Sequence, residues 1–179
     1  SPLGDFIENQ FVDNTRNTYV NANAYLELTP VKGFSFKTII SGTLNNARRG
    51  QYWGDQSNAN RPSYAGSPHA SITNTYRNEY LWDNIINYNK TFGEDHDLGL
   101  TALSSWIKAQ YEDNMSAGSG QLLDSWSFYS MMSSVNPHVE SSFNQRQKMS
   151  YAFRLNYSFK GKYLFTFSNR WDGVSWFSP

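Results

Sequence analysis

The chain has 179 residues, and its 15 lysines and arginines balance its 15 aspartates and glutamates, so its formal net charge is zero. This balance argues against a nucleic-acid partner, which usually requires a basic surplus, and the lack of cysteine excludes disulfides and thiolate chemistry. Aromatic residues make up 17% of the chain although its mean hydropathy is -0.65, a combination typical of membrane barrels and of sugar-binding β-sandwiches.

No apolar run approaches the roughly 18 residues that a membrane helix needs. The first residues also lack the charged region and the apolar core of a signal peptide. We therefore expect that an exported form of this chain is a mature protein or a piece cut from a longer one.

Two expected strands, 19–29 and 34–45, form the first hairpin. Residues 1–18 before it are rich in Asn and Asp and predict a loop that could include a short strand at 6–12. From residue 19 onward, apolar and polar side chains alternate, which indicates a strand because successive side chains leave a strand on opposite faces. Proline and glycine at 30–33 predict the turn between the two strands.

Residues 46–74 predict a long loop, since Asn, Ser, Gly, Pro and Arg dominate there without any period. The next hairpin is expected at 75–112, with a polar turn at 91–97. The apolar residues of its second strand change register part-way along, which predicts a β-bulge near 103–106.

A second long loop is expected at 113–144. Within it, Leu122, Trp126 and Tyr129 recur at helical spacing and predict a short helix at 120–131. Long loops without regular structure are uncommon in compact soluble domains, whereas outer-membrane barrels combine long extracellular loops with short periplasmic turns. The loop lengths therefore favour a barrel.

The third hairpin, expected at 145–177, has the strictest alternation in the chain. One face is apolar or aromatic, the other is polar, and a basic turn at 160–162 joins the two strands. A membrane barrel needs such strands, because one face contacts lipid and the other contacts a wet lumen. We expect the lumen to receive Arg154 and Asn156, and the lipid to receive Met149, Tyr151, Phe153, Leu155 and Tyr157.

The sequence therefore predicts an all-β fold, an antiparallel up-and-down transmembrane β-barrel segment with about six strands. Bacterial barrels need at least about eight strands, so either two strands are missed or the chain forms an arc of a larger barrel. Two other interpretations stay open. One is a complete eight-stranded outer-membrane barrel with a structural or adhesive role. The other is a soluble carbohydrate-binding β-sandwich, in which the apolar faces of all six strands would meet in a core.

Three stretches of the chain have motifs that carry a family resemblance. In NYSFKGKYLFTFSNRWDGVSWF (156–177), a tyrosine-rich strand turns through Lys-Tyr-Leu and continues to an Asp-Gly pair. The stretch 80–92 has the pattern Trp-Asp-Asn-x-Ile-x-Tyr-x-Lys-x-Phe, and 21–37 has a hairpin that ends in Gly-Phe-Ser-Phe-Lys. Together they resemble TonB-dependent outer-membrane transporters of the SusC/RagA type, although Val174 and Trp176 stand where that family tends to have Ser and Arg. The motif residues are Lys162, Tyr163, Leu164, Arg170, Asp172, Gly173, Ser175 and Phe177.

The resemblance implies a 22-stranded barrel in the bacterial outer membrane, plugged by an N-terminal domain and capped by a SusD-like surface lipoprotein. Such a transporter imports oligosaccharides or peptides with energy from the TonB complex, which acts through the plug. This chain would then be an internal segment without the plug, supplying lipid-facing strands and extracellular loops. The resemblance implies no cofactor and no enzymatic activity.

Five loop aromatics are weak candidates for substrate binding, because aromatic rings can stack on sugars or anchor peptides: Tyr52, Trp53, Tyr64, Trp126 and Tyr129. The alternative is that these rings pack their own loops. Asp172-Gly173 is either a functional loop signature or a pair that provides turn geometry.

The run Glu94-Asp95-His96-Asp97 superficially suggests metal ligands. Four consecutive residues cannot all face one ion, however, and no second cluster supports them, so we expect a solvated turn. The three histidines lie in separate loops or turns without a nucleophile motif. We therefore assign no catalytic residue and no metal site.

Overall fold

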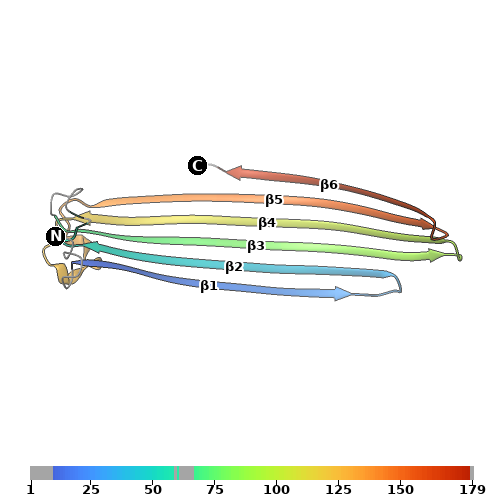
Figure 1. The fold of residues 1–179 in the computed structure, drawn as a ribbon, viewed down its shortest axis with the longest axis horizontal. Helices are drawn as coiled ribbons and strands as arrows, with labels where there is room; N and C mark the ends of the chain where they lie inside the picture. The colour runs from blue at the N-terminus through green and yellow to red at the C-terminus, as the bar shows by residue number, and fades with distance from the viewer. Residues whose placement is uncertain (1–9, 59, 61–66, 178–179) are drawn as a thin grey trace. The chain divides into compact units, whose positions relative to one another are not determined.

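The computed structural model describes residues 10–58, 60 and 67–177 of the chain. They form one six-stranded sheet in which each strand pairs with its neighbours in sequence, in the order β1-β2-β3-β4-β5-β6 (Figure 1). The all-β, up-and-down fold is therefore confirmed. The strands are β1 (Phe11–Leu28), β2 (Phe34–Trp53), β3 (His69–Phe92), β4 (His96–Ser119), β5 (His138–Phe159) and β6 (Tyr163–Phe177).

Three tight turns join the strands within the hairpins, as the sequence predicts. Gly33, Gly93 and Gly161 have φ angles of +84°, +61° and +64°, a left-handed conformation that glycine adopts without steric cost. Gly33 has a second constraint, since a Cβ there would lie 2.1 Å from the backbone oxygen of Asn89. The Asn89 amide donates to the Gly33 carbonyl at 2.7 Å, so this turn packs directly on the backbone of β3.

The strands continue well beyond their predicted ends. The two connections between the hairpins are 54–68 and 120–137, shorter than the predicted loops 46–74 and 113–144. Likewise, β1 already begins at Phe11, inside the stretch predicted as a loop. Several of the added strand residues are polar on both faces, as with the consecutive Arg48 and Arg49, so they show little contrast between faces from which a strand could be recognised.

The predicted helix at 120–131 is also wrong in its extent. Only two single turns of 3-10 helix occur in this connection, η2 (Asp124–Trp126) and η3 (Met131–Ser133). Ser127, which follows η2, has a φ of +49° and interrupts any longer helix. Leu122, Trp126 and Tyr129 are 77%, 37% and 73% exposed, so the residues at helical spacing do not share a buried face.

The β-bulge predicted near 103–106 is absent from the described part of β4. Thr101 donates to Asn87, Asn84 donates to Ser104, and Thr75 donates to Asp113. In each pair the two residues lie equally far from the β3–β4 turn, so the register does not slip along the strand. Ile107, Ala109 and Tyr111 therefore lie on the same face as Thr101, opposite to Leu98 and Leu100.

The chain divides into two compact units, each assembled from pieces of several strands. The loop unit comprises Ser1–Tyr19, Leu44–Arg77 and Tyr111–Phe143, and the turn unit comprises Val20–Thr43, Asn78–Gln110 and Asn144–Pro179. The loop unit has a small apolar core of Tyr52, Ala70 and Phe128, against which Val12, Ile72 and Met131 pack. Gly50 makes room for it, because a Cβ there would lie 2.5 Å from the Phe128 ring.

The turn unit has no buried apolar side chain among the described residues. Many of its large apolar side chains are at least 40% exposed. The soluble β-sandwich interpretation is wrong, since it requires these faces to meet in a core. The exposed set includes Val20, Leu26, Ile40, Tyr80, Trp82, Ile86, Met149, Tyr151, Phe165, Phe167 and Trp171.

Candidate functional site

The register of the β5–β6 hairpin separates an apolar face from a polar face. Tyr157 lies opposite Phe165, Leu155 opposite Phe167, and Ser150 opposite Asp172. Paired residues of antiparallel strands project to the same side, so aromatic pairs lie on one face and hydroxyl, amide and charged pairs on the other. The predicted separation of Phe153 and Arg154 onto opposite faces follows from this register.

The apolar face has the height of a bilayer core. It runs along β5 from Met149 to Phe159, 11 residues, which is the length of a tilted membrane strand. At about 3.3 Å per residue and a tilt near 45°, this span covers about 25 Å. No helix in the described part of the chain is long and apolar enough to cross a membrane.

The polar face of the turn unit carries a network of side-chain hydrogen bonds between neighbouring strands. Asn87 accepts from Thr101 at 2.9 Å, and Thr166 donates to Asn156 at 3.0 Å. Glu27 lies 3.6 Å from the Lys37 ammonium. These groups are partly or largely exposed, as expected for a wet surface. Hydrogen-bonding groups therefore join neighbouring strands on this face.

An ionic cluster around Asp172 dominates this face on β5 and β6. Arg170 donates to both carboxylate oxygens of Asp172, at 2.9 and 3.0 Å, in the bidentate geometry that arginine prefers. The Ser150 hydroxyl donates to Asp172 at 2.5 Å, and the Lys148 ammonium lies 3.3 Å away. In the sequence, Arg170 and Asp172 are recognisable only as motif residues, and no local pattern identifies Lys148 and Ser150. Their positions follow once the turn at 160–162 sets the register.

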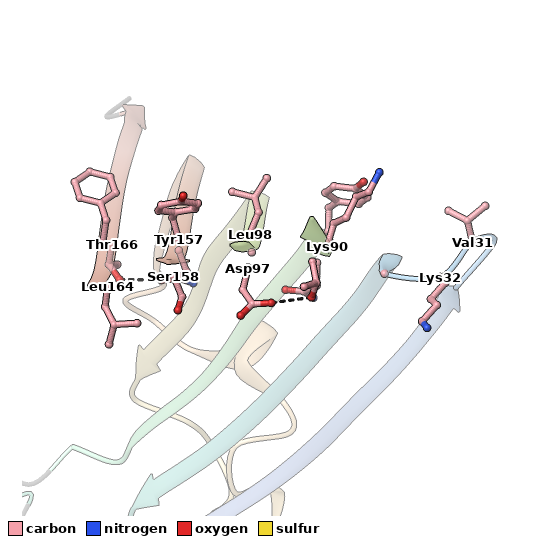
Figure 2. A pocket seen from close by; sticks show the side chains of 16 residues that line it. Val31, Lys32, Lys90, Asp97, Leu98, Tyr157, Ser158, Leu164 and Thr166 are labelled. Carbon is pink, nitrogen blue, oxygen red and sulfur yellow. Dashed lines mark hydrogen bonds between the residues drawn. The ribbon is translucent and has the colours of Figure 1, made fainter. Parts of the chain in front are cut away.

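A hollow of about 980 Å³ lies in the turn unit, close to the tight turns (Figure 2). Its lining comes from both faces of the sheet: Leu98 and Tyr157 point to one side, whereas Asp97 and Ser158 point to the other. Asp97 accepts a hydrogen bond from Thr91 at 2.7 Å, which holds the end of the β3–β4 hairpin together. Only a few polar groups converge here, and we assign no ligand to it.

The predicted solvated turn at 94–97 has separate partners for its polar residues. Asp95 lies 3.5 Å from Lys160, and His96 hydrogen-bonds through Nδ1 to the Tyr157 hydroxyl at 2.6 Å. In the described residues no group of three potential ligands could hold a metal ion.

The candidate substrate-binding aromatics have different surroundings. Tyr52 is fully buried and donates its hydroxyl to Asp124, which also accepts from Gln10 at 2.6 Å. The structure thus favours the packing alternative for Tyr52. Trp53 stacks on His69 with ring centroids 5.5 Å apart, so it too packs within the loop unit.

The other candidates in the loop connections are more accessible. Trp126 is 37% exposed and Tyr129 is 73% exposed, and the Arg48 guanidinium lies 5.5 Å from the Tyr129 ring. Tyr64 lies outside the described residues. Whether Trp126 and Tyr129 contact a solute stays a prediction.

The family-motif residues lie in and beside β6. Lys162 donates its amide to the Phe159 carbonyl at 3.0 Å and closes the turn, while Tyr163 and Leu164 are 70% and 78% exposed. Asp172-Gly173 does not provide turn geometry, because both residues lie within β6 and Gly173 pairs with Met149. Ser175 pairs with Gln147, and the backbone of Phe177 pairs with Gln145.

A sheet of long, sequentially paired strands, with one lipid-like face and one wet face, defines the wall of a transmembrane β-barrel. Within the described residues, β1 and β6 each have a single neighbour, so the sheet is open.

The chain is 29% identical over 185 residues to the TonB-dependent receptor P3 of Formosa agariphila, an alignment that covers 98% of this chain and 18% of the receptor. It is 27% identical over 183 residues to the TonB-dependent receptor P26 of the same organism, with 99% and 18% covered. No protein-family model matches. The chain spans about a fifth of the length of these relatives.

Among solved structures, the fold resembles the RagAB peptide transporter with a TM-score of 0.77, 19% identity and coverage of 92% of this chain and 18% of that chain. The RagAB peptide importer in its closed-closed state gives the same TM-score and identity, with 95% and 19% covered. Sequence and fold together support a segment of a SusC/RagA-type TonB-dependent transporter, an outer-membrane protein. The predicted likeness to TonB-dependent outer-membrane transporters is thereby confirmed.

Proposed function

We propose that this chain is part of a TonB-dependent outer-membrane importer of peptides or oligosaccharides, and that it supplies barrel strands and extracellular loops. The observation that carries the proposal is the similarity of nearly the whole chain to two TonB-dependent receptors. The two-faced sheet supports it, because an importer needs a lipid-facing exterior and a wet passage.

The open edges of the sheet support a place inside a larger barrel. An unpaired strand in lipid leaves backbone N–H and C=O groups without partners, and each costs several kcal/mol. Strands outside the described sheet must therefore pair with β1 and β6. The 22 strands of the family are the expected total.

The partners of the whole transporter follow from the same proposal. The TonB complex would act through a plug outside this segment, and a SusD-like lipoprotein would cover the extracellular opening. The connections 54–68 and 120–137 are longer than the tight turns, and we assign them to the extracellular mouth. The relatives are receptors and transporters, and we propose no catalytic step for this chain.

Uptake by the bacterium that encodes the chain tests this function. Deletion of the full-length gene should abolish accumulation of at least one labelled neutral peptide or oligosaccharide, and disruption of TonB should have the same effect. Re-expression of the full-length gene is the control. Unchanged uptake of every peptide and oligosaccharide after deletion would contradict an importer.

The lipoprotein partner has its own test. Full-length protein purified from the outer membrane should bring with it a lipoprotein at a constant ratio. If the full-length protein purifies without a lipoprotein, and import proceeds at the normal rate in cells, the proposed lipoprotein partner is wrong. The proposed import function would not be affected by that result.

A further inference from the structure

Two arginines on the polar face of the β5–β6 hairpin lie close together across the strands. Ala152 pairs with Arg170 and Arg154 pairs with Ser168, which makes the two arginines diagonal neighbours, about 7–8 Å apart at the backbone. The residue directly opposite each arginine is small, so no side chain fills the space between the two. A hollow of about 370 Å³ lies there, lined by Thr101, Leu103, Ala152, Phe153, Arg154, Ser168, Asn169 and Arg170.

Arg154 has unused hydrogen-bonding capacity. Its Nε donates to the Ser168 hydroxyl at 3.2 Å, which fixes the plane of the guanidinium beside the hollow. No acidic side chain of the described residues lies within ion-pair distance of it. The two terminal nitrogens of the guanidinium are therefore available to a carboxylate, whose planar geometry matches them.

The neighbouring ionic cluster around Asp172 adds positive charge close to Arg154. Arg154 itself forms no ion pair with an acidic side chain of the described residues. Asp172 balances one cation, yet both Arg170 and Lys148 bind it. This part of the face thus has three cations and one carboxylate, since Arg154 adds to the two cations that bind Asp172. The Asp172 contacts also hold Arg170 in place, so the site is rigid before a solute arrives.

We propose that the hollow between Arg154 and Arg170 binds a carboxylate of the passing solute. The proposal rests on the proposed import function, because it places the polar face in the passage. The solute is then an acidic peptide or an oligosaccharide that contains uronic acid, two sources of the same carboxylate chemistry.

Binding to the full-length protein tests the site with two pairs of probes. One pair is tetraglutamate and tetraglutamine, and the other is tetragalacturonate and its methyl ester. The intact protein should prefer the acidic member of at least one pair by about tenfold, since a charge-assisted hydrogen bond contributes that much. The pair that shows the preference identifies the source of the carboxylate.

The Arg154→Gln variant should lose this preference and keep its affinity for the neutral member. Arg16→Gln, at an exposed strand arginine outside the hollow, is the matched control and should keep the preference. A preference that survives Arg154→Gln, or equal affinity within both pairs, would overturn the proposal. Import of neutral solutes in the uptake experiment would still support the importer, so the two failures are distinguishable.

Chemical labelling gives a second readout at the site itself. Phenylglyoxal should modify Arg154 more slowly when the acidic probe is present, as followed by mass spectrometry of the digested protein, while Arg16 reacts at an unchanged rate. Equal protection of both arginines, or protection by the neutral probe alone, would overturn the proposal.

Discussion

Phe167 provides the strongest test of the two-faced sheet. It lies opposite Leu155 and is 48% exposed, on the apolar face. Leu155 is six residues from Met149 and four from Phe159, which places the Phe167 pair about 14 Å and 9 Å from the two ends of the apolar face. The site is thus close to the middle of the bilayer.

The Phe167→Arg change should destabilise the full-length protein by about 2–4 kcal/mol, the cost of a lipid-facing arginine near the midplane. Thr166→Arg is the matched control, one residue away on the polar face. It loses one exposed hydrogen bond to Asn156 and should cost about 1 kcal/mol or less. The measurement is reversible guanidinium unfolding of each protein in phospholipid vesicles.

An equal or larger cost for Thr166→Arg would refute the assignment of the two faces. Nitroxide labels at Phe153 and Arg154 give an independent check in the folded protein. The label at 153 should be relaxed by oxygen dissolved in lipid, and the label at 154 by a water-soluble nickel complex. Equal shielding of both positions from lipid would contradict a membrane strand.

Two further predictions concern the turns and the loop unit. Gly161→Ala should cost about 1–2 kcal/mol, the cost of a left-handed residue, whereas Gly33→Ala should cost more because its Cβ would meet the Asn89 carbonyl. Thermal unfolding of the full-length protein compares them, and equal melting temperatures would contradict this. Tyr52→Phe removes a buried hydroxyl bond to Asp124 and should destabilise the 120–137 connection by about 1–3 kcal/mol. Amide hydrogen exchange there should quicken, with exposed Tyr129→Phe as a control that leaves it unchanged.

The strands of the turn unit were predictable because each contrasts an apolar face with a polar one. That contrast exists only where one face meets lipid. Arg48 and Arg49 are consecutive strand residues on opposite faces, and both are charged, so the polar ends of β2 resembled a loop. The sequence signal was lost where both faces of the sheet are polar.

The candidate site was less predictable, because it depends on pairing between strands. Arg170 and Asp172 are two residues apart on one strand, and this spacing alone places them on the same face. Lys148 and Ser150 join them only through the β5–β6 register. The hydrogen bonds of Tyr52 and Gln10 to Asp124 join segments that are far apart in the sequence, for which the local sequence has no pattern.

The unbroken register of β3 and β4 restricts how this sheet can change its length during evolution. Removing one residue from a strand moves every later side chain to the opposite face, so lipid would meet Asn87 and Thr101 in place of Ile86 and Leu100. Two residues can be removed without this exchange. Strands in functional relatives should therefore differ in length by even numbers, whereas the connections 54–68 and 120–137 can vary by any number.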